Sequence, residues 1–248
     1  MRLSSAASAP ERLDYYGSAV VGASTIGERA TAPELVDGAT SEVHELDPDA
    51  YTAHVAAFVA DGRARAGPTW RYADIVTVLA AATELLRPDS YLEIGVRRGR
   101  SASVVARRAP ACSILGIDLW NVGYAGIENP GPKHVRSRLH EVGHAGEVEL
   151  LSGDSHDVLP QLWRDRSGLT FDLITVDGDH STRGAARDLR DVLPRLRIGG
   201  ALVFDDISHP AHPKLASVWR RVVESERRYG TWTFDDVGYG VAVAVRRW

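Results

Sequence analysis

The chain has 248 residues, of which 44% are hydrophobic and 25% are charged, so it is long enough and apolar enough to bury a sizeable core. Its net charge of -4 argues against a nucleic-acid partner, and its single cysteine, Cys112, excludes a framework of intrachain disulfides. No apolar stretch approaches the ~18 residues of a membrane span, and the N-terminus lacks the apolar segment of a signal peptide. We therefore expect a cytoplasmic globular protein with no membrane partner.

The first 88 residues differ in pattern from the rest of the chain. Residues 1–46 are rich in Ala, Ser, Gly and Thr with little periodicity, which predicts a flexible N-terminal arm or lid, or simply a disordered tail. Residues 47–88 show helical periodicity in two stretches, one ending at Gly62 and one stopped by Pro88. They predict a helical N-terminal extension.

From residue 89 to residue 248, short apolar runs alternate with amphipathic stretches. The expected strands are 90–94, 113–118, 147–152, 171–177 and 201–205, and the expected helices are 99–108, 133–143, 155–164, 182–195 and 212–228. This alternation predicts a Rossmann-like α/β domain, with a mostly parallel sheet and helices on both faces. The C-terminal residues 231–248 read as two strands joined by a short turn, so an antiparallel hairpin completes a sheet of seven strands.

Ligands of open α/β sheets bind beyond the carboxyl ends of the strands, so the residues at those ends predict the site. The first strand leads into "YLEIGVRRGRSA", where Glu93, Gly95 and Gly99 form a glycine-containing turn before a helix. Glycines let the backbone approach a ligand, and a helix N-terminus offers free N–H groups. The spacing is not the G-x-G-x-x-G of dinucleotide folds. Arg97 and Arg98 allow a phosphate ligand, whereas Glu93 favours a cationic ligand or hydrogen bonds with the turn.

The second and third strands also end in polar residues. Asp118 is suited to accept hydrogen bonds from both hydroxyls of a ribose, or to cap the next helix. Asp154 and Ser155 are suited to bond an adenine amino group, or merely to cap the helix that follows. A glycine turn and two acids at three successive strand ends together predict a pocket for an adenosine that bears a positive centre.

These segments resemble the class I S-adenosylmethionine-dependent methyltransferases over about residues 70–248. Within that superfamily, "VDGDH" and "DDISHP" resemble the metal-dependent O-methyltransferases, which include the catechol and caffeoyl-CoA type and bacterial enzymes acting on antibiotic sugars. The resemblance implies S-adenosylmethionine as cofactor, with Asp177 as a cofactor contact and a catalytic residue. It also implies a magnesium ion held by Asp177, Asp205 and Asp206, and it allows a homo-oligomer.

Carboxylates gathered at neighbouring strand ends repel one another unless a cation lies among them. Mg²⁺ favours such oxygen ligands, and the Cys and His spacing of zinc sites is missing nearby. The alternative is that Asp205 and Asp206 cap the next helix, while Asp177 alone touches the cofactor or acts as base. Mg²⁺ would lower the pKa of an acceptor hydroxyl, and a neighbouring hydroxyl would chelate the same ion. This chemistry favours a vicinal diol on a small molecule such as a natural-product sugar or phenol.

His180 is the first candidate for the catalytic base, because it follows Asp177 by three residues. The alternative is that it orients a carboxylate. Asp179, His209 and His212 are weaker candidates. The Gly- and Pro-rich stretch 120–134 is expected to contact the acceptor or to act as a lid.

Three other functions stay open at this point. They are a metal-independent methyltransferase with His180 or Asp177 as sole base, an aminopropyl transferase, and a nucleoside-binding protein without catalysis. Nucleic-acid methylation is disfavoured, because residues 177–180 lack the Asn-Pro-Pro-aromatic motif and the acidic loops would repel phosphates.

Overall fold

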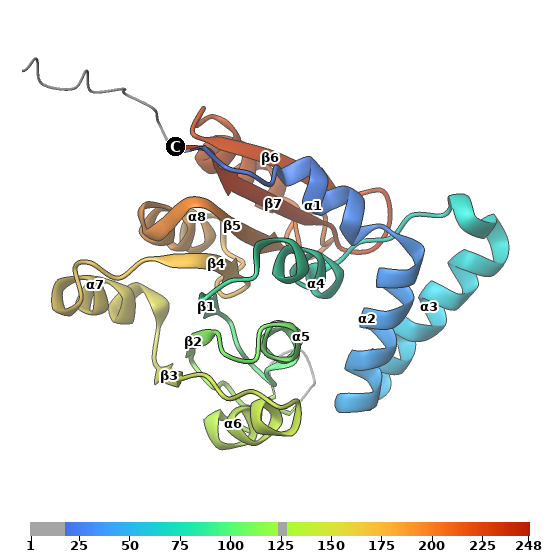
Figure 1. The fold of residues 1–248 in the computed structure, drawn as a ribbon, viewed down its shortest axis with the longest axis horizontal. Helices are drawn as coiled ribbons and strands as arrows, with labels where there is room; N and C mark the ends of the chain where they lie inside the picture. Colours follow the sequence, from blue (N-terminus) through green and yellow to red (C-terminus); the bar gives the residue numbers. More distant parts are fainter. Residues whose placement is uncertain (1–17, 124–127) are drawn as a thin grey trace, which may run out of the picture.

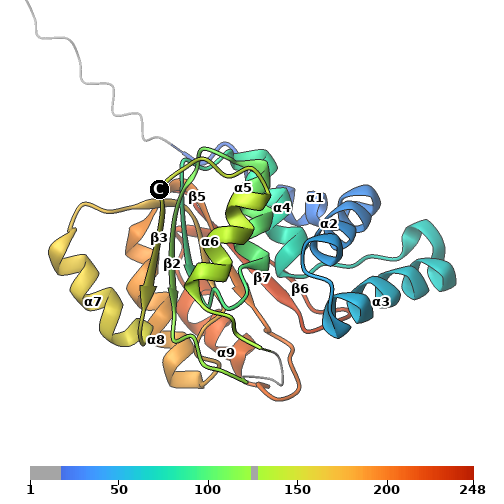
Figure 2. The ribbon, with the colours of Figure 1, turned by 90° about the horizontal axis from the view of Figure 1, so that it is seen from below.

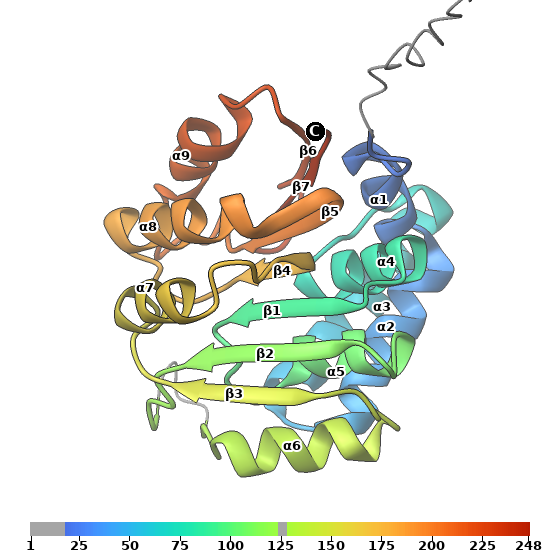
Figure 3. The same ribbon diagram turned by 60° about the vertical axis from the view of Figure 1, so that its left-hand side comes forward.

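A seven-stranded sheet runs through the molecule in the order β3-β2-β1-β4-β5-β7-β6 (Figures 1 and 3). The computed structural model describes residues 18–123 and 128–248. The strands are β1 (Ser90–Ile94), β2 (Ser113–Asp118), β3 (Val148–Ser152), β4 (Phe171–Val176), β5 (Leu196–Asp205), β6 (Tyr229–Phe234) and β7 (Val241–Arg246). Strands β1 to β5 are parallel, and β7 is antiparallel to both of its neighbours, β5 and β6. The predicted fold class is confirmed.

Helices cover both faces of the sheet (Figure 2). They are α1 (Ala23–Ala30), α2 (Pro33–Leu46), α3 (Ala50–Ala66), α4 (Ile75–Leu86), α5 (Arg100–Arg108), α6 (Pro132–Glu141), α7 (Ser155–Asp165), α8 (Thr182–Val192) and α9 (Leu215–Trp219). One core cluster joins the sheet to α1, α2, α4, α5 and α6, and the other joins it to α7, α8 and α9. Successive side chains of a strand point to opposite faces, so Tyr91 lies in the first cluster and Leu92 in the second.

The expected loosely ordered arm is wrong for the described part of residues 1–46. Helices α1 and α2 form there, and Ile26 and Val36 are fully buried. Helix α1 packs on β6, where Gly27 meets Trp232 so closely that a Cβ would lie 2.2 Å from the indole ring. Leu35, Val36, Ala39 and Val43 of α2 do recur at helical spacing on one buried face, a pattern that the sequence analysis missed. Residues 1–17 lie outside the described part.

Other boundaries differ from expectation for local reasons. Helix α3 continues past Gly62, because Trp70 packs against that glycine and a Cβ there would lie 2.2 Å from the ring. Strand β5 begins at Leu196, earlier than expected. Helix α9 is short and continues into a π-helical turn over 220–224. Within the described residues, every helix is too short or too polar to span a bilayer.

Candidate active site

The carboxyl ends of the parallel strands border a cavity of about 1170 Å³. Most of the expected site residues line it: Gly95, Asp118, Asp154, Ser155, Asp177, His180, Asp205 and Asp206. Pockets for one small ligand usually span roughly 300–1,000 Å³. The cavity is therefore large enough for a nucleoside cofactor together with a small acceptor.

The glycine turn after β1 packs directly on the turn after β4. Gly95 has φ of 93°, and a Cβ at that residue would lie 2.0 Å from the backbone oxygen of Asp177. Asp118 fixes this turn from β2, because its Oδ2 accepts a hydrogen bond of 2.7 Å from the backbone N–H of Arg97. Its Oδ1 accepts a further bond from the N–H of Trp120. The side-chain amide of Asn129 also donates to Oδ1, at 3.5 Å, so of about four acceptor positions roughly one stays open for a ribose hydroxyl.

Glu93, in β1 just before the turn, and Gly99, at the end of the turn, contact the neighbouring helices α5 and α6. Glu93 is fully buried and accepts a hydrogen bond from the Ser101 hydroxyl. Burial, opposed by the Ser101 bond and reinforced by nearby carboxylates, raises the pKa of Glu93 to about 8. Gly99 has φ of 75° and meets Val135 of α6. One oxygen of Glu93 thus binds Ser101 of α5, while the other, Oε2, is buried and accepts no hydrogen bond of normal geometry among the described residues.

The arginines of the turn also have protein partners. The guanidinium of Arg98 donates to both oxygens of Asp47, at 2.7 and 2.8 Å. Asp47 lies at the end of α2 and is only 4% exposed. A phosphate ligand for Arg98 is therefore not supported.

The turn after β3 caps the helix that follows it and also lies at the cavity. Asp154 caps α7 by accepting a hydrogen bond of 2.8 Å from the N–H of His156, and it also lines the cavity. The hydroxyl of Ser155 donates at 2.6 Å to Asp188 of α8, a residue that the sequence analysis did not single out. Ser155 is mostly buried at the wall of the cavity.

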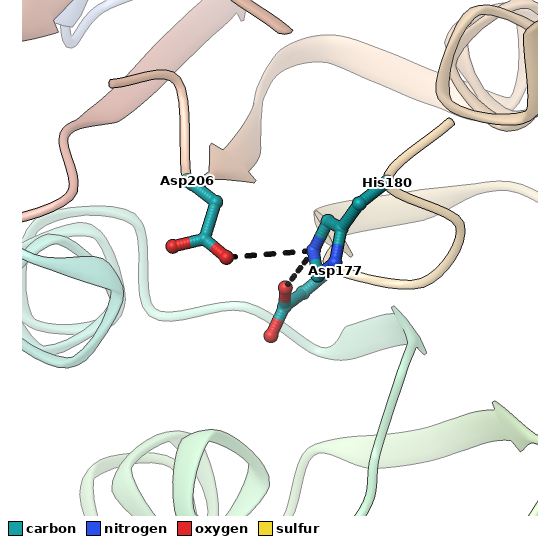
Figure 4. Close-up of side chains that lie close together, drawn as sticks. All are labelled: Asp177, His180 and Asp206. Carbon is teal, nitrogen blue, oxygen red and sulfur yellow. Dashed lines mark hydrogen bonds and ion pairs between the residues drawn. The ribbon is translucent and has the colours of Figure 1, made fainter. Parts of the chain in front are cut away.

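A carboxylate and histidine cluster lies where β4 and β5 end (Figure 4). His180 Nε2 is 3.1 Å from Asp177 Oδ1 and 3.6 Å from Asp206 Oδ2. Among the described residues, these three side chains offer ligand atoms that all lie within 4.8 Å of one another. Asp205, an expected ligand, lines the cavity outside this cluster. The cluster instead includes His180.

The charges of the cluster are strongly coupled. Burial, together with Asp177 and Asp206, raises the pKa of Asp205 well above its ordinary value. Burial and Asp177 raise the pKa of Asp206 to about 6, against the effect of His180 and His209. Burial alone would lower the pKa of His180, but its hydrogen bond to Asp177 and the nearby carboxylates raise it. Excess negative charge thus gathers at this point, as a cation site requires.

The weaker candidates for the catalytic base lie around the cluster: Asp179, His209 and His212. Asp179 turns towards α8, where its Oδ1 accepts a bond of 2.7 Å from the N–H of Ser181. The rings of His180 and His212 have centroids 4.6 Å apart, His212 and His209 5.0 Å, and His209 and Tyr239 4.3 Å. This row of rings runs along the cavity from the cluster outwards.

Tyr51 is a site residue that the sequence analysis missed. It begins α3 and lines both the main cavity and a smaller adjoining one. No strand-end position marks it in the sequence, since it reaches the site only through the docking of the N-terminal helices. The expected acceptor loop 120–134 is described in part: Asn121 and Asn129 line the cavity, and 124–127 lie outside the described residues.

Comparisons with known proteins agree with this geometry. Residues 92–207 match the model of a family described as "Methyltransferase domain", whereas no curated protein matches the chain. The O-methyltransferase TomG from Streptomyces achromogenes, involved in tomaymycin synthesis and solved in complex with SAM, is 26% identical, with a TM-score of 0.53. That match covers 68% of this chain and 78% of TomG.

A second solved structure matches this chain over nearly the whole length of that second protein. The O-methyltransferase from Bacillus cereus, solved in complex with SAH, is 18% identical with a TM-score of 0.56. The match covers 86% of this chain and 99% of that one. The resemblance to class I S-adenosylmethionine-dependent O-methyltransferases that was drawn from the motifs is confirmed.

Proposed function

We propose that this chain, an S-adenosylmethionine-dependent O-methyltransferase of the class I fold, methylates one hydroxyl of a small-molecule vicinal diol with the help of Mg²⁺. The observation that carries the proposal is the cluster of Asp177, His180 and Asp206, whose ligand atoms lie within 4.8 Å of one another. The cluster opens into the same cavity as Asp118 and Asp154. A cofactor at those acids and an acceptor at the cluster would therefore meet in one cavity.

The residues at the cluster fit a hard divalent cation. Carboxylate oxygens of Asp177 and Asp206 would hold it, with Asp205 close behind them at the end of β5. Burial and the neighbouring carboxylates raise the pKa values of Asp205 and Asp206, so a divalent cation among them would stabilise their charged forms. When bound, a divalent cation supplies Lewis-acid activation of an acceptor hydroxyl.

The chain's own residues supply the proton acceptor and the orientation. His180 Nε2 lies between the two carboxylates, so a hydroxyl that reaches the cluster also comes within reach of this nitrogen (Figure 4). We assign His180 as the base. Asp118 and Asp154 would hold the ribose and adenine, and Asp177 lines the same cavity beside them.

The acceptor side of the cavity favours a small, hydroxylated molecule. Six carboxylates line the cavity, which disfavours a phosphodiester: Asp118, Asp154, Asp177, Asp179, Asp205 and Asp206. The row of His212, His209 and Tyr239 offers ring faces and hydrogen-bonding edges. TomG, the 26% identical structure, is described as involved in tomaymycin synthesis, which supports a natural-product sugar or phenol and a role in antibiotic biosynthesis. A cytoplasmic location and a homo-oligomer stay predictions.

An assay of methyl transfer tests this function. The protein would be incubated with S-adenosylmethionine and a panel of catechols and sugar diols, each paired with its mono-hydroxyl analogue. We expect S-adenosylhomocysteine to form with diols only, to stop forming after chelation, and to return with added Mg²⁺. Full activity after exhaustive chelation would favour the metal-independent alternative.

A further inference from the structure

Asp188 is a fully buried carboxylate in the second half of α8, outside the cavity. One of its oxygens, Oδ1, reaches the turn after β3, because it accepts a hydrogen bond of 2.6 Å from the Ser155 hydroxyl. The same oxygen lies 3.3 Å from His156 Nε2. Burying a carboxylate is costly unless specific partners stabilise it, and both partners here belong to the first residues of α7.

The other oxygen, Oδ2, faces the turn after β4. A Cβ on Gly178 would lie 3.5 Å from Asp188 Oδ2 and 2.8 Å from a methyl group of Ile94. Within the described part of the chain, Oδ2 is buried and accepts no hydrogen bond of normal geometry. Burial raises the pKa of Asp188 to about 6, while the Ser155 hydroxyl, His156 and the backbone amide of Asp179 act in the opposite sense. One side chain thus lies beneath both turns.

The turn after β4 packs closely against α8, the helix that carries Asp188. The carboxylate of Asp179 lies against Gly184 of α8, where a Cβ would come within 1.7 Å of it. The Ser181 hydroxyl caps the helix by accepting a bond of 3.0 Å from the N–H of Gly184. His156 from the other turn approaches the Gly184 carbonyl at 3.3 Å. Both turns therefore rest on α8 within one helical turn of Asp188.

We propose that Asp188 is a positioning residue that holds the turn after β3 and the turn after β4 in fixed relation to each other. It touches neither cofactor nor acceptor itself. Through Ser155 it fixes the wall of the adenosine pocket, and through Gly178 and Asp179 it fixes the segment that carries Asp177 and His180. The proposal rests on the proposed function for the assignment of these two turns to cofactor and cation.

The test combines two binding measurements on the full-length protein with substitutions of Asp188. Asp188→Ala should weaken S-adenosylmethionine binding by calorimetry, and Mn²⁺ binding by electron paramagnetic resonance, each by about tenfold, the scale of one lost hydrogen bond to a charged group. Asp188→Asn keeps an acceptor for Ser155 and should stay within about threefold of wild type. Asp191→Asn, the matched control one turn later on α8, should change neither affinity.

Local exchange separates positioning from mere stability. In Asp188→Ala, amide deuterium exchange should rise in residues 178–181 at a temperature where the protein stays folded. A lower melting temperature with both affinities and this exchange unchanged would overturn the proposal, and so would weaker cofactor binding alone with unchanged Mn²⁺ binding.

Two further outcomes are covered by the design. If Asp188→Ala does not fold, Ser155→Ala is measured instead, because it removes the hydrogen bond between Asp188 and the turn after β3. Amide exchange should then rise in residues 178–181 of the turn after β4, and unchanged exchange there overturns the proposal. If the wild-type protein binds no Mn²⁺, the metal part of the proposed function fails. Cofactor affinity and exchange in 178–181 then still decide the role of Asp188.

Discussion

At the scale of single residues, one carboxylate can serve the fold and the site together. Asp118 was predicted as the ribose ligand, and the structure shows that it also fixes the glycine turn through the N–H of Arg97. The two roles use different lone pairs of the same side chain. The sequence predicted Asp118 because a strand end marks it.

Replacing Asp118 should therefore damage cofactor binding in two ways. Asp118→Ala removes the acceptor for the ribose and releases the turn, so S-adenosylmethionine affinity measured by calorimetry should fall by at least about tenfold. Asp89→Ala, at an exposed acid before β1 at the opposite end of the sheet, serves as control and should bind normally. Unchanged affinity in Asp118→Ala would remove this residue from the site.

His180 carries the second prediction at this scale. His180→Gln keeps a polar side chain of similar reach but takes up no proton near neutral pH, so turnover should fall by roughly a hundredfold, the usual scale for a general base. Cofactor affinity should not change. His140→Gln, at an exposed histidine of α6, is the matched control. If the loss appears mainly as weaker Mg²⁺ binding, His180 orients a carboxylate instead.

Residues that act through tertiary contacts escaped the sequence analysis. Asp177, Asp206 and His180 stand at strand ends and were predicted, although their grouping without Asp205 was not. Asp188 lies inside a helix and Tyr51 lies in the N-terminal extension, where neither spacing nor neighbours point to a site. Their positions follow from how α8 and α3 dock, and local sequence patterns do not encode docking.

At the scale of elements, the N-terminal helices are built into the domain. The strands and the helices between them were predicted well, because alternating apolar runs have a strong period. Helices α1 and α2 were missed, since their stability depends on tertiary contacts with β6, α4 and α5. Two glycines of these helices provide a matched test.

Gly27→Ala and Gly38→Ala should change stability in opposite directions. Gly27 faces Trp232 with no room for a Cβ, so its substitution should lower the free energy of unfolding by about 1–3 kcal/mol. Gly38 of α2 is exposed, with open space around it, so alanine there should raise stability by about 0.5–1 kcal/mol. Urea unfolding measures both. Equal effects would mean that α1 is not packed on β6.

Asp47 ties the end of α2 to the glycine turn and to α6. It pairs with Arg98, Arg100 and Arg138, at 2.7, 2.7 and 3.1 Å. Burial opposes the charged form, but the arginines hold the pKa of Asp47 at about 2, below its ordinary value of 3.8. This shift stabilises the fold by on the order of 2 kcal/mol, because each pKa unit is worth about 1.4 kcal/mol.

The pH dependence follows from the sign of that shift. The folded pKa is depressed, so the stabilisation is fully present above pH 3.8 and is lost as the pH falls towards 2. Asp47→Asn should therefore lower the free energy of unfolding at pH 7 and show a shallower loss as the pH falls from 3.8 to about 2. Asp37→Asn, which breaks an exposed pair with Arg63, should cost less than about 1 kcal/mol. A parallel pH profile of wild type and Asp47→Asn would contradict this account.

At the scale of the whole molecule, the topology explains why distant motifs form one site. The order β3-β2-β1-β4-β5 brings the ends of five parallel strands to one edge of the sheet, so residues from 95 to 206 border a single cavity. This convergence was predictable from the strand pattern. The lining by Tyr51 and Tyr239 was not, because these residues come from segments before β1 and after β6 that no strand end of the parallel sheet marks.

The most direct test of the central claim is a crystal of the protein grown with S-adenosylhomocysteine and Mn²⁺, measured at the manganese absorption edge. We predict an anomalous peak between the carboxylates of Asp177 and Asp206, with the ribose of the cofactor product at Asp118. Bound S-adenosylhomocysteine with no anomalous peak at these carboxylates, or with a peak only elsewhere, would contradict the metal-assisted mechanism and leave a methyltransferase that works without a cation.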